Sequence, residues 1–148
     1  MQTLKHCSLL LFIPVLIGCN VSPKPIIYGV DACHYCAMTI VDKFHAAEIV
    51  TKKGKIYTFD ATECMVNFLN DFDTSRVNLF LTTNYSNPEE FIDATTATFL
   101  ISKNIPSPMG GFISGFKTKN DAINAQSKNG GDLYNWNELI EYLKNSNK

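Results

Sequence analysis

The first half of the chain carries short apolar runs whose spacing changes from strand-like to helix-like. Residues 47–51 and 55–59 are rich in β-forming side chains and are separated by Lys-Lys-Gly, which predicts a hairpin. Apolar residues then recur every three or four positions over 61–72, which predicts an amphipathic helix. Residues 77–82 return to a strand-like pattern. The predicted order of elements is therefore ββαβ.

The second half repeats this order less clearly. We expect further strands at 95–102, 111–116 and 132–134, and helices at 117–128 and 136–144. Asn129-Gly130-Gly131 should stop the first of these helices. A threonine stands near its start, Thr118, as Thr62 does in the earlier helix, where Asp60 is a second candidate for the cap. Together these elements predict an α+β fold.

The N-terminal segment has the pattern of an export signal. Lys5 precedes an apolar run, Leu9 to Ile17, that is too short to span a bilayer. Leu16-Ile17-Gly18-Cys19 resembles a bacterial lipobox, which predicts a signal peptide over residues 1–18 and a lipid on Cys19; a plain secretory signal is the alternative. Residues 19–30 contain two prolines and are predicted to form a flexible tether. We therefore expect the protein in the cell envelope, lipid-anchored on the periplasmic face of the inner or outer membrane.

Charge and motif content exclude several classes of function. The formal net charge is −1, and losing Lys5 with the signal makes it −2. Neither value provides the basic footprint of a nucleic-acid-binding protein, so we expect no nucleic-acid partner. The chain has no Gly-x-Ser-x-Gly and no His-Glu-x-x-His motif. We predict that the protein is not an enzyme.

Soft metal donors are concentrated in residues 33–38, Cys-His-Tyr-Cys-Ala-Met. Thiolate and thioether sulfur favour a soft ion such as Cu(I). Met38 argues for copper, because a thioether is an uncommon zinc ligand and no thiol–disulfide exchange requires one. Since the segment precedes the first regular element, we expect it on a surface loop that a partner can reach.

The remaining cysteine and histidine residues have weaker claims as ligands. Cys64 lies inside the predicted helix and is interpreted as a small buried hydrophobic residue. His34 is an alternative ligand, whereas His45 is expected at the surface. Two other functions stay open for the Cys33/Cys36 pair. One is a membrane-tethered thiol–disulfide oxidoreductase, and the other is a structural zinc-binding module that adds Cys64 and a histidine.

The combination of motifs resembles the NosL copper lipoproteins that accompany nitrous oxide reductase. The matching residues are the lipobox ending at Cys19, Cys33-x-x-Cys36-x-Met38-x-Ile40, Phe59 to Cys64, Ser107-Pro108-Met109-Gly110, Phe116 and Gly130-Gly131. Members of this family commonly have glycine at the positions of Ala37 and Ser107.

The resemblance implies a copper-binding domain over residues 31–148. This domain should consist of two small similar ββαβ units packed together, at about 31–84 and 85–148. The implied cargo is Cu(I), held by a metal site made of Cys33, Cys36, Met38 and Met109. The implied function is that of a chaperone without bond chemistry, which delivers copper to apo nitrous oxide reductase or its membrane assembly complex.

Overall fold

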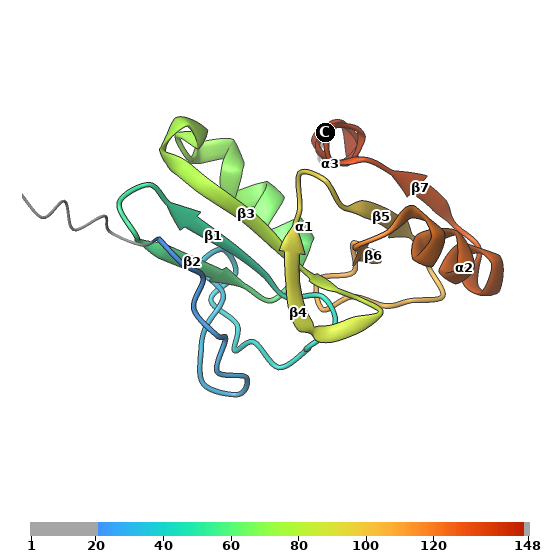
Figure 1. Ribbon diagram of the computed structural model, residues 1–148, viewed down its shortest axis with the longest axis horizontal. Coiled ribbons are helices and arrows are strands. Elements are labelled where there is room, and N and C mark those ends of the chain that lie inside the picture. The colour runs from blue at the N-terminus through green and yellow to red at the C-terminus, as the bar shows by residue number, and fades with distance from the viewer. Residues whose placement is uncertain (1–20, 147–148) are drawn as a thin grey trace, which may run out of the picture.

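The computed structural model describes residues 21–146 and places their strands in one mixed sheet (Figure 1). The strand order is β2-β1-β3-β6-β5-β7, and β4 pairs with β3 beside this path. Neighbouring strands are antiparallel except β3 and β6, whose parallel pairing joins Asn84 to Gly115. The strands are β1 (Ala47–Thr51), β2 (Ile56–Phe59), β3 (Val77–Asn84), β4 (Asn87–Asp93), β5 (Thr98–Ile101), β6 (Ile113–Phe116) and β7 (Asp132–Tyr134). The fold is therefore mixed α/β, built on a seven-stranded sheet.

Helices cover both faces of this sheet. Residues 21–146 contain three α-helices, and two 3₁₀ turns connect the first of them to β3. Phe99 and Ile113 share the larger core with α1 and α3, whereas Leu100 and Phe116 pack with α2. Because side chains alternate along a strand, α1 and α3 lie on one face and α2 on the other. The helical elements are α1 (Thr62–Phe68), η1 (Leu69–Asp71), η2 (Thr74–Arg76), α2 (Lys119–Asn129) and α3 (Trp136–Ser146).

Two triplets of strands have the same internal order. In each triplet, the strand that comes first in the sequence lies between the other two in the sheet. β1 lies between β2 and β3, and β5 lies between β6 and β7. In each triplet a helix precedes the last strand, α1 before β3 and α2 before β7. Along the chain, the order β1-β2-α1-β3 is followed, after β4, by the order β5-β6-α2-β7.

The departures from the predicted elements have local causes. β4 was not predicted, because Asn87-Pro88-Glu89-Glu90 is rich in residues that strands disfavour; it forms an edge strand that pairs with β3. The strand expected from residue 95 begins at Thr98, since Asp93 accepts a hydrogen bond from the Thr95 N–H and closes a turn.

The first helix is shorter than predicted and is not capped as predicted. α1 ends at Phe68, where the 3₁₀ turn η1 follows. Ala61 occupies the N-cap position without a side-chain hydrogen bond, so neither Asp60 nor Thr62 caps the helix. In α2, by contrast, the Thr118 hydroxyl accepts a hydrogen bond of 3.1 Å from the Asp121 N–H.

The predicted signal peptide, Cys19 and the start of the predicted tether lie outside the described residues. Residues 21–30 form no helix or strand, but some of them pack against the domain. The Lys24 N–H donates a hydrogen bond of 3.1 Å to Glu48, and Ile26 is buried in the larger core. From Lys24 onward the chain therefore belongs to the folded domain. No helix within residues 21–146 is long and apolar enough to cross a membrane.

Candidate metal centre

A tight turn positions the two cysteines of the 33–38 segment. The Cys33 N–H donates to the Met38 carbonyl at 2.8 Å, and the Ala37 N–H donates to the Cys33 carbonyl at 2.9 Å. Closing this turn places Ala37 at a φ of 63°, in the left-handed region that glycine adopts more easily. The His34 N–H donates to the Thr58 carbonyl at 2.9 Å, which fixes the turn against β2. The expected loop placement is confirmed.

Three cysteines and one aspartate converge where this turn meets β2 and α1. Cys33 and Cys36 come from the turn, Asp60 directly follows β2, and Cys64 lies at the start of α1. Their three sulfurs and one carboxylate oxygen all lie within 4.8 Å of one another. Cys33, Asp60 and Cys64 are buried, and Cys36 is half-buried. Cys64 is buried in the larger core, as the sequence predicted, and its thiol is also one of the four groups of this cluster.

The three thiols differ strongly in acidity. The hydrogen bond with Cys64 lowers the pKa of Cys33 to about 6, and backbone N–H groups reinforce this effect against the opposing effect of burial. The same contact with Cys33, followed by burial and Asp60, raises the pKa of Cys64. Burial raises the pKa of Cys36. At neutral pH the site therefore presents one thiolate, Cys33, between two thiols.

Asp60 lies beside the Cys36 thiol. This thiol lies 3.7 Å from each of the two carboxylate oxygens of Asp60, within the range of a weak hydrogen bond from sulfur. A soft metal binds the thiolate form of cysteine, so binding releases protons. Metal binding at Cys36 would therefore remove the proton that this thiol shares with Asp60.

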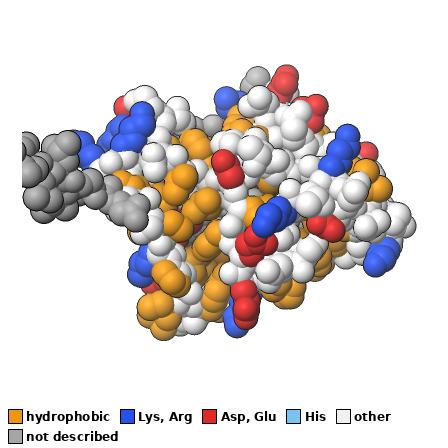
Figure 2. Space-filling view, in the orientation of Figure 1, with side chains coloured by type: hydrophobic (Ala, Val, Ile, Leu, Met, Phe, Trp, Pro, Cys, Tyr) orange, Lys and Arg blue, Asp and Glu red, His pale blue; other side chains and the backbone are white. Residues whose placement is uncertain are grey.

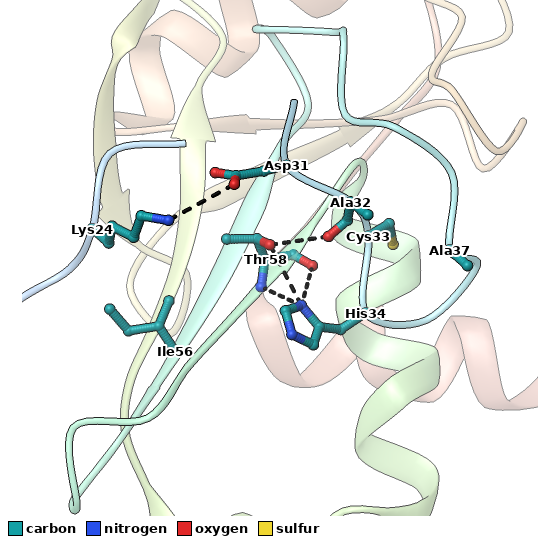
Figure 3. Close-up of a pocket in the computed structure, with 8 residues that line it drawn as sticks. All are labelled: Lys24, Asp31, Ala32, Cys33, His34, Ala37, Ile56 and Thr58. Atoms are coloured by element: carbon teal, nitrogen blue, oxygen red, sulfur yellow. Dashed lines mark hydrogen bonds and ion pairs between the residues drawn. The ribbon is translucent and has the colours of Figure 1, made fainter. Parts of the chain in front are cut away.

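The same segment also holds the predicted ligand Met38 and the alternative ligand His34. The Met38 side chain is 54% exposed. His34 Nδ1 accepts a hydrogen bond of 3.1 Å from the Thr58 N–H, and its ring packs edge-on against Tyr57 with centroids 5.2 Å apart. Figure 3 shows the imidazole turned toward Thr58, beside a surface hollow that Cys33 also lines. His34 is thus engaged with β2 rather than with the thiols.

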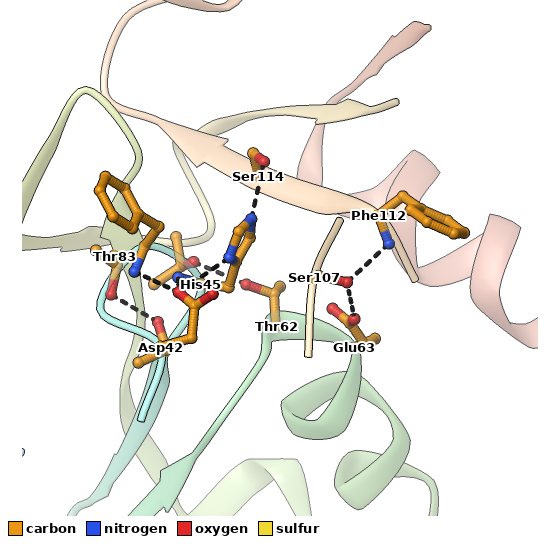
Figure 4. Close-up of polar contacts among 11 residues, drawn as sticks. Asp42, His45, Thr62, Glu63, Thr83, Ser107, Phe112 and Ser114 are labelled. Atoms are coloured by element: carbon orange, nitrogen blue, oxygen red, sulfur yellow. Dashed lines mark hydrogen bonds and ion pairs between the residues drawn. The ribbon is translucent and has the colours of Figure 1, made fainter. Parts of the chain in front are cut away.

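The turn that carries Met109 is tied to the start of α1. The Ser107 hydroxyl donates to Glu63 Oε1 at 2.5 Å (Figure 4). The Gly111 N–H donates to the same oxygen at 3.0 Å. A Cβ atom at position 111 would lie 2.7 Å from Glu63 Cδ, so this close approach requires glycine. Met109 is 42% exposed on this turn. Because Cys64 follows Glu63, the structure brings the second-half turn to the helix end that carries the thiol cluster.

His45 was predicted at the surface, and this is wrong. Its side chain is 4% exposed, with Nδ1 3.1 Å from Asp42 and Nε2 3.3 Å from the Ser114 hydroxyl (Figure 4). This aspartate–histidine–serine chain has the order of a hydrolytic triad, but Ser114 is fully buried. A substrate has no access to it. The contact instead joins the segment before β1 to β6.

The family model for NosL matches residues 26–143, most of the chain. The chain belongs to the NosL family. The crystal structure of the copper chaperone NosL from Shewanella denitrificans matches with a TM-score of 0.70 and 27% identity, over 80% of this chain and 95% of that one. No match is found among curated proteins. Membership in NosL, a non-enzymatic family, confirms the expected resemblance and agrees with the prediction that the protein is not an enzyme.

Asp60 and Cys64 are the site residues that sequence analysis did not assign. Asp60 lies between β2 and the N-cap of α1, and Cys64 lies in the first turn of the helix four positions later. This Asp-x-x-x-Cys spacing, just after a predicted strand, was the available signal.

Proposed function

We propose that this protein captures Cu(I) at the Cys33, Cys36 and Cys64 thiols and delivers it for maturation of a copper enzyme. The observation that carries this function is the convergence of three sulfurs and Asp60 within 4.8 Å in a NosL-family chain. Thiolates favour Cu(I), and the similar protein from Shewanella denitrificans is described as a copper chaperone. The proposed client is apo nitrous oxide reductase or its membrane assembly complex.

The acidities of the thiols indicate the order in which they bind. Cys33 meets the ion as a thiolate, since its pKa lies below neutral. Cys36, which is half-buried beside Asp60, then gives up its proton and closes the shell. Cys64 approaches from the buried side. This order leaves the exposed side of the ion for a ligand that can be exchanged.

Met38 and Met109 are the proposed exchangeable ligands. Both side chains are substantially exposed, and their two turns meet the same end of α1. A thioether is a neutral, weaker ligand than a thiolate, so an incoming donor from a partner can displace it without removing the cysteines. Weak, exposed thioether ligands combined with buried thiols would suit capture of the ion followed by its transfer to a partner.

A structural zinc site is the second candidate, because three cysteines and an aspartate also form a four-ligand zinc set. The experiment is anaerobic titration with Cu(I) and with Zn(II), followed by metal analysis and X-ray absorption. We expect one Cu(I) in a sulfur-only shell, with affinity that falls at least tenfold in Cys64→Ser and stays within twofold in His34→Ala. Tighter four-coordinate zinc, or equal copper affinity in the three proteins, would refute the proposal. An oxidoreductase would instead cycle a Cys33–Cys36 disulfide in thiol exchange assays.

The proposed site of action is the membrane surface, through a lipid on Cys19. The lipobox-like sequence before Cys19 supports this anchor. Detergent phase separation tests it: the wild-type protein should enter the detergent phase, and Cys19→Ser should stay aqueous. If both forms stay aqueous, there is no anchor.

We also infer that residues 31–148 form one copper-binding domain made of two similar ββαβ units, at about 31–84 and 85–148. Support comes from the equal order of the strand triplets β2-β1-β3 and β6-β5-β7. In this arrangement the first unit supplies the thiols, and the second supplies the Met109 turn.

A further inference from the structure

A cationic surface lies at the tip of the β1–β2 hairpin. It is formed by Lys52, Lys53, Lys55 and Arg76, which are all exposed. The Lys52 N–H donates to the Arg76 carbonyl at 2.9 Å, so the end of η2 is fixed against the hairpin. The four side chains line one shallow hollow together with Thr51 and Ser75. The fold thus gathers positive charges that are spread out in the sequence.

Neighbouring carboxylates do not neutralise this surface. The ion pairs within residues 21–146 are Lys24–Asp31, His45–Asp42 and Lys117–Glu90, and none of them involves the four cations. Asp73 is the carboxylate beside them; hydrogen bonds from Ser75 lower its pKa, and the charges of Arg76 and Lys52 add to this effect. Four positive charges against this carboxylate leave the surface strongly positive.

Two of the cations are held in place by aromatic rings. Lys55 Nζ lies 4.6 Å from the centroid of the Tyr57 ring, and the Arg76 guanidinium lies 5.4 Å from that of Phe72. Figure 2 shows Lys and Arg side chains gathered at this end of the molecule. The surface is therefore partly ordered before it meets a partner, which reduces the entropy lost on binding.

The start of the described chain lies at the same end. Lys24 and Ile56 line one hollow together with Cys33, and Ile56 adjoins Lys55. Figure 1 shows the first described residues beside β2. The five Cα-to-Cα steps from Cys19 to Lys24 span at most about 18 Å when extended. A lipid on Cys19 would therefore keep the hairpin tip within reach of the bilayer.

We propose that this surface docks on the anionic phospholipid headgroups of the membrane. Each Lys or Arg near an anionic bilayer strengthens binding by about fivefold. Asp60, one of the four groups of the thiol cluster, directly follows β2 at the end of the strand that lies opposite the hairpin tip. Docking through the tip would fix the orientation of the domain, with the hairpin tip rather than the Asp60 end of β2 against the bilayer.

The test uses the mature chain from residue 19 with Cys19→Ser, so that binding does not depend on the proposed lipid. Co-sedimentation is measured with vesicles of pure phosphatidylcholine and with vesicles that contain phosphatidylglycerol. The test variant is Lys52→Gln/Lys53→Gln. The control is Lys119→Gln/Lys128→Gln, which removes the same charge from exposed positions of α2.

We expect binding to anionic vesicles only, at least a tenfold loss in the hairpin variant, and a change within twofold in the α2 control. Salt should release the protein because it screens exposed charges. Equal binding to neutral vesicles, or equal losses in both variants, would overturn the proposal. Stronger release by inorganic phosphate than by chloride at matched ionic strength would also overturn it, since the surface would then be a site for free phosphate. These outcomes do not depend on copper affinity, so they separate this inference from the chaperone function.

Discussion

The Ser107 hydroxyl donates a hydrogen bond of 2.5 Å to Glu63 Oε1 across 44 positions of sequence. Glu63 directly precedes Cys64, so this contact ties the turn that carries Met109 to the helix end that carries the third thiol. The second carboxylate oxygen, Oε2, is buried and has no hydrogen-bond partner within the described residues. Burying a carboxylate oxygen without a donor is costly, so the donors to Oε1 have to offset this cost.

Replacing Ser107 with alanine should therefore weaken both the fold and the metal site. Removing one of two donors to a buried carboxylate should lower the free energy of unfolding by about 1–3 kcal/mol. Copper affinity should fall as well, because the Met109 turn loses its attachment to α1. Urea denaturation of the apo protein and competition with a Cu(I) chelator measure the two effects. Ser127→Ala, in the exposed part of α2, is the control and should change neither.

A double-mutant comparison shows whether the contact acts through Met109. In a Met109→Leu background, Ser107→Ala should have almost no further effect on copper affinity while its cost in stability persists. An equal loss of copper affinity in both backgrounds would mean that the Glu63–Ser107 contact does not position Met109.

The backbone of the 33–38 turn gives a second prediction. Ala37 has a φ of 63°, a conformation that costs an L-residue other than glycine about 1–2 kcal/mol. Glycine removes this strain but adds freedom to the unfolded chain, which offsets about 0.4–1 kcal/mol. Ala37→Gly should therefore stabilise the apo protein by up to about 1 kcal/mol in urea denaturation. Ala32→Gly, in the same loop without a positive φ, should destabilise it; a loss of stability in both variants would contradict the strain at Ala37.

Local patterns in the sequence were sufficient for most elements but not for the metal site. The strand at 132–134 was predicted with the observed bounds, and the final helix, predicted at 136–144, ends only two residues later in the structure. These predictions succeeded because hydrophobic spacing and glycine stops act over a few residues. The role of Cys64 depends on a meeting between the 33–36 turn and the start of α1. Local spacing predicted that one face of that helix is buried. It could not predict which side chains from distant segments would contact that face.

The same limit explains why the burial of His45 was not predicted. Its burial depends on Ser114, which lies 69 positions later and reaches it only when β6 joins the sheet. Ala37 and Ser107, by contrast, stand at positions where the resemblance implied glycine, and the structure shows what each side chain does there. Ala37 takes a glycine-like φ, and Ser107 gains a hydrogen bond that glycine cannot make.

Glu48 makes the stability of the fold depend on pH. Its side chain is fully buried in β1, and burial raises its pKa to about 7 against the opposing hydrogen bond from the Lys24 N–H. The unfolded chain loses this proton near pH 4.5, whereas the folded chain keeps it until about pH 7. The contribution to stability is therefore complete below pH 4.5 and is lost as the pH rises to about 7, with a loss of about 3 kcal/mol.

Substitution by glutamine should remove this dependence. The lowered pKa of Cys33, about 6, has the opposite effect between pH 6 and pH 8, so the test compares variants rather than the net change of one protein. Urea denaturation at pH 5 and pH 8 should show that the unfolding free energy of Glu48→Gln changes more favourably with rising pH than that of the wild-type protein, with Glu48→Gln the more stable of the two at pH 8. Glu141→Gln, an exposed position on α3, should change as the wild-type protein does. If the change is the same in all three proteins, Glu48 makes no contribution to it.

The two methionines separate the copper function from zinc binding and from thiol exchange. Met38 and Met109 are 54% and 42% exposed, so replacing either with leucine should cost less than about 1.5 kcal/mol of packing energy. Copper affinity should nevertheless fall in each single variant, because leucine has no sulfur. Met65→Leu is the matched control: this methionine is fully buried in the core, and its replacement should affect stability without changing copper affinity.

The double variant tests whether one ion joins the two turns. If Met38 and Met109 complete a single shell, breaking it once removes most of their contribution, and the second substitution should add a smaller loss than the first. Chelator competition for the wild-type, single and double variants measures this coupling, and apo melting curves exclude unfolding as the cause. Additive losses would indicate that the methionines bind independently. Unchanged copper affinity in both single variants would mean that the thiols of Cys33, Cys36 and Cys64 hold the metal without thioether ligands.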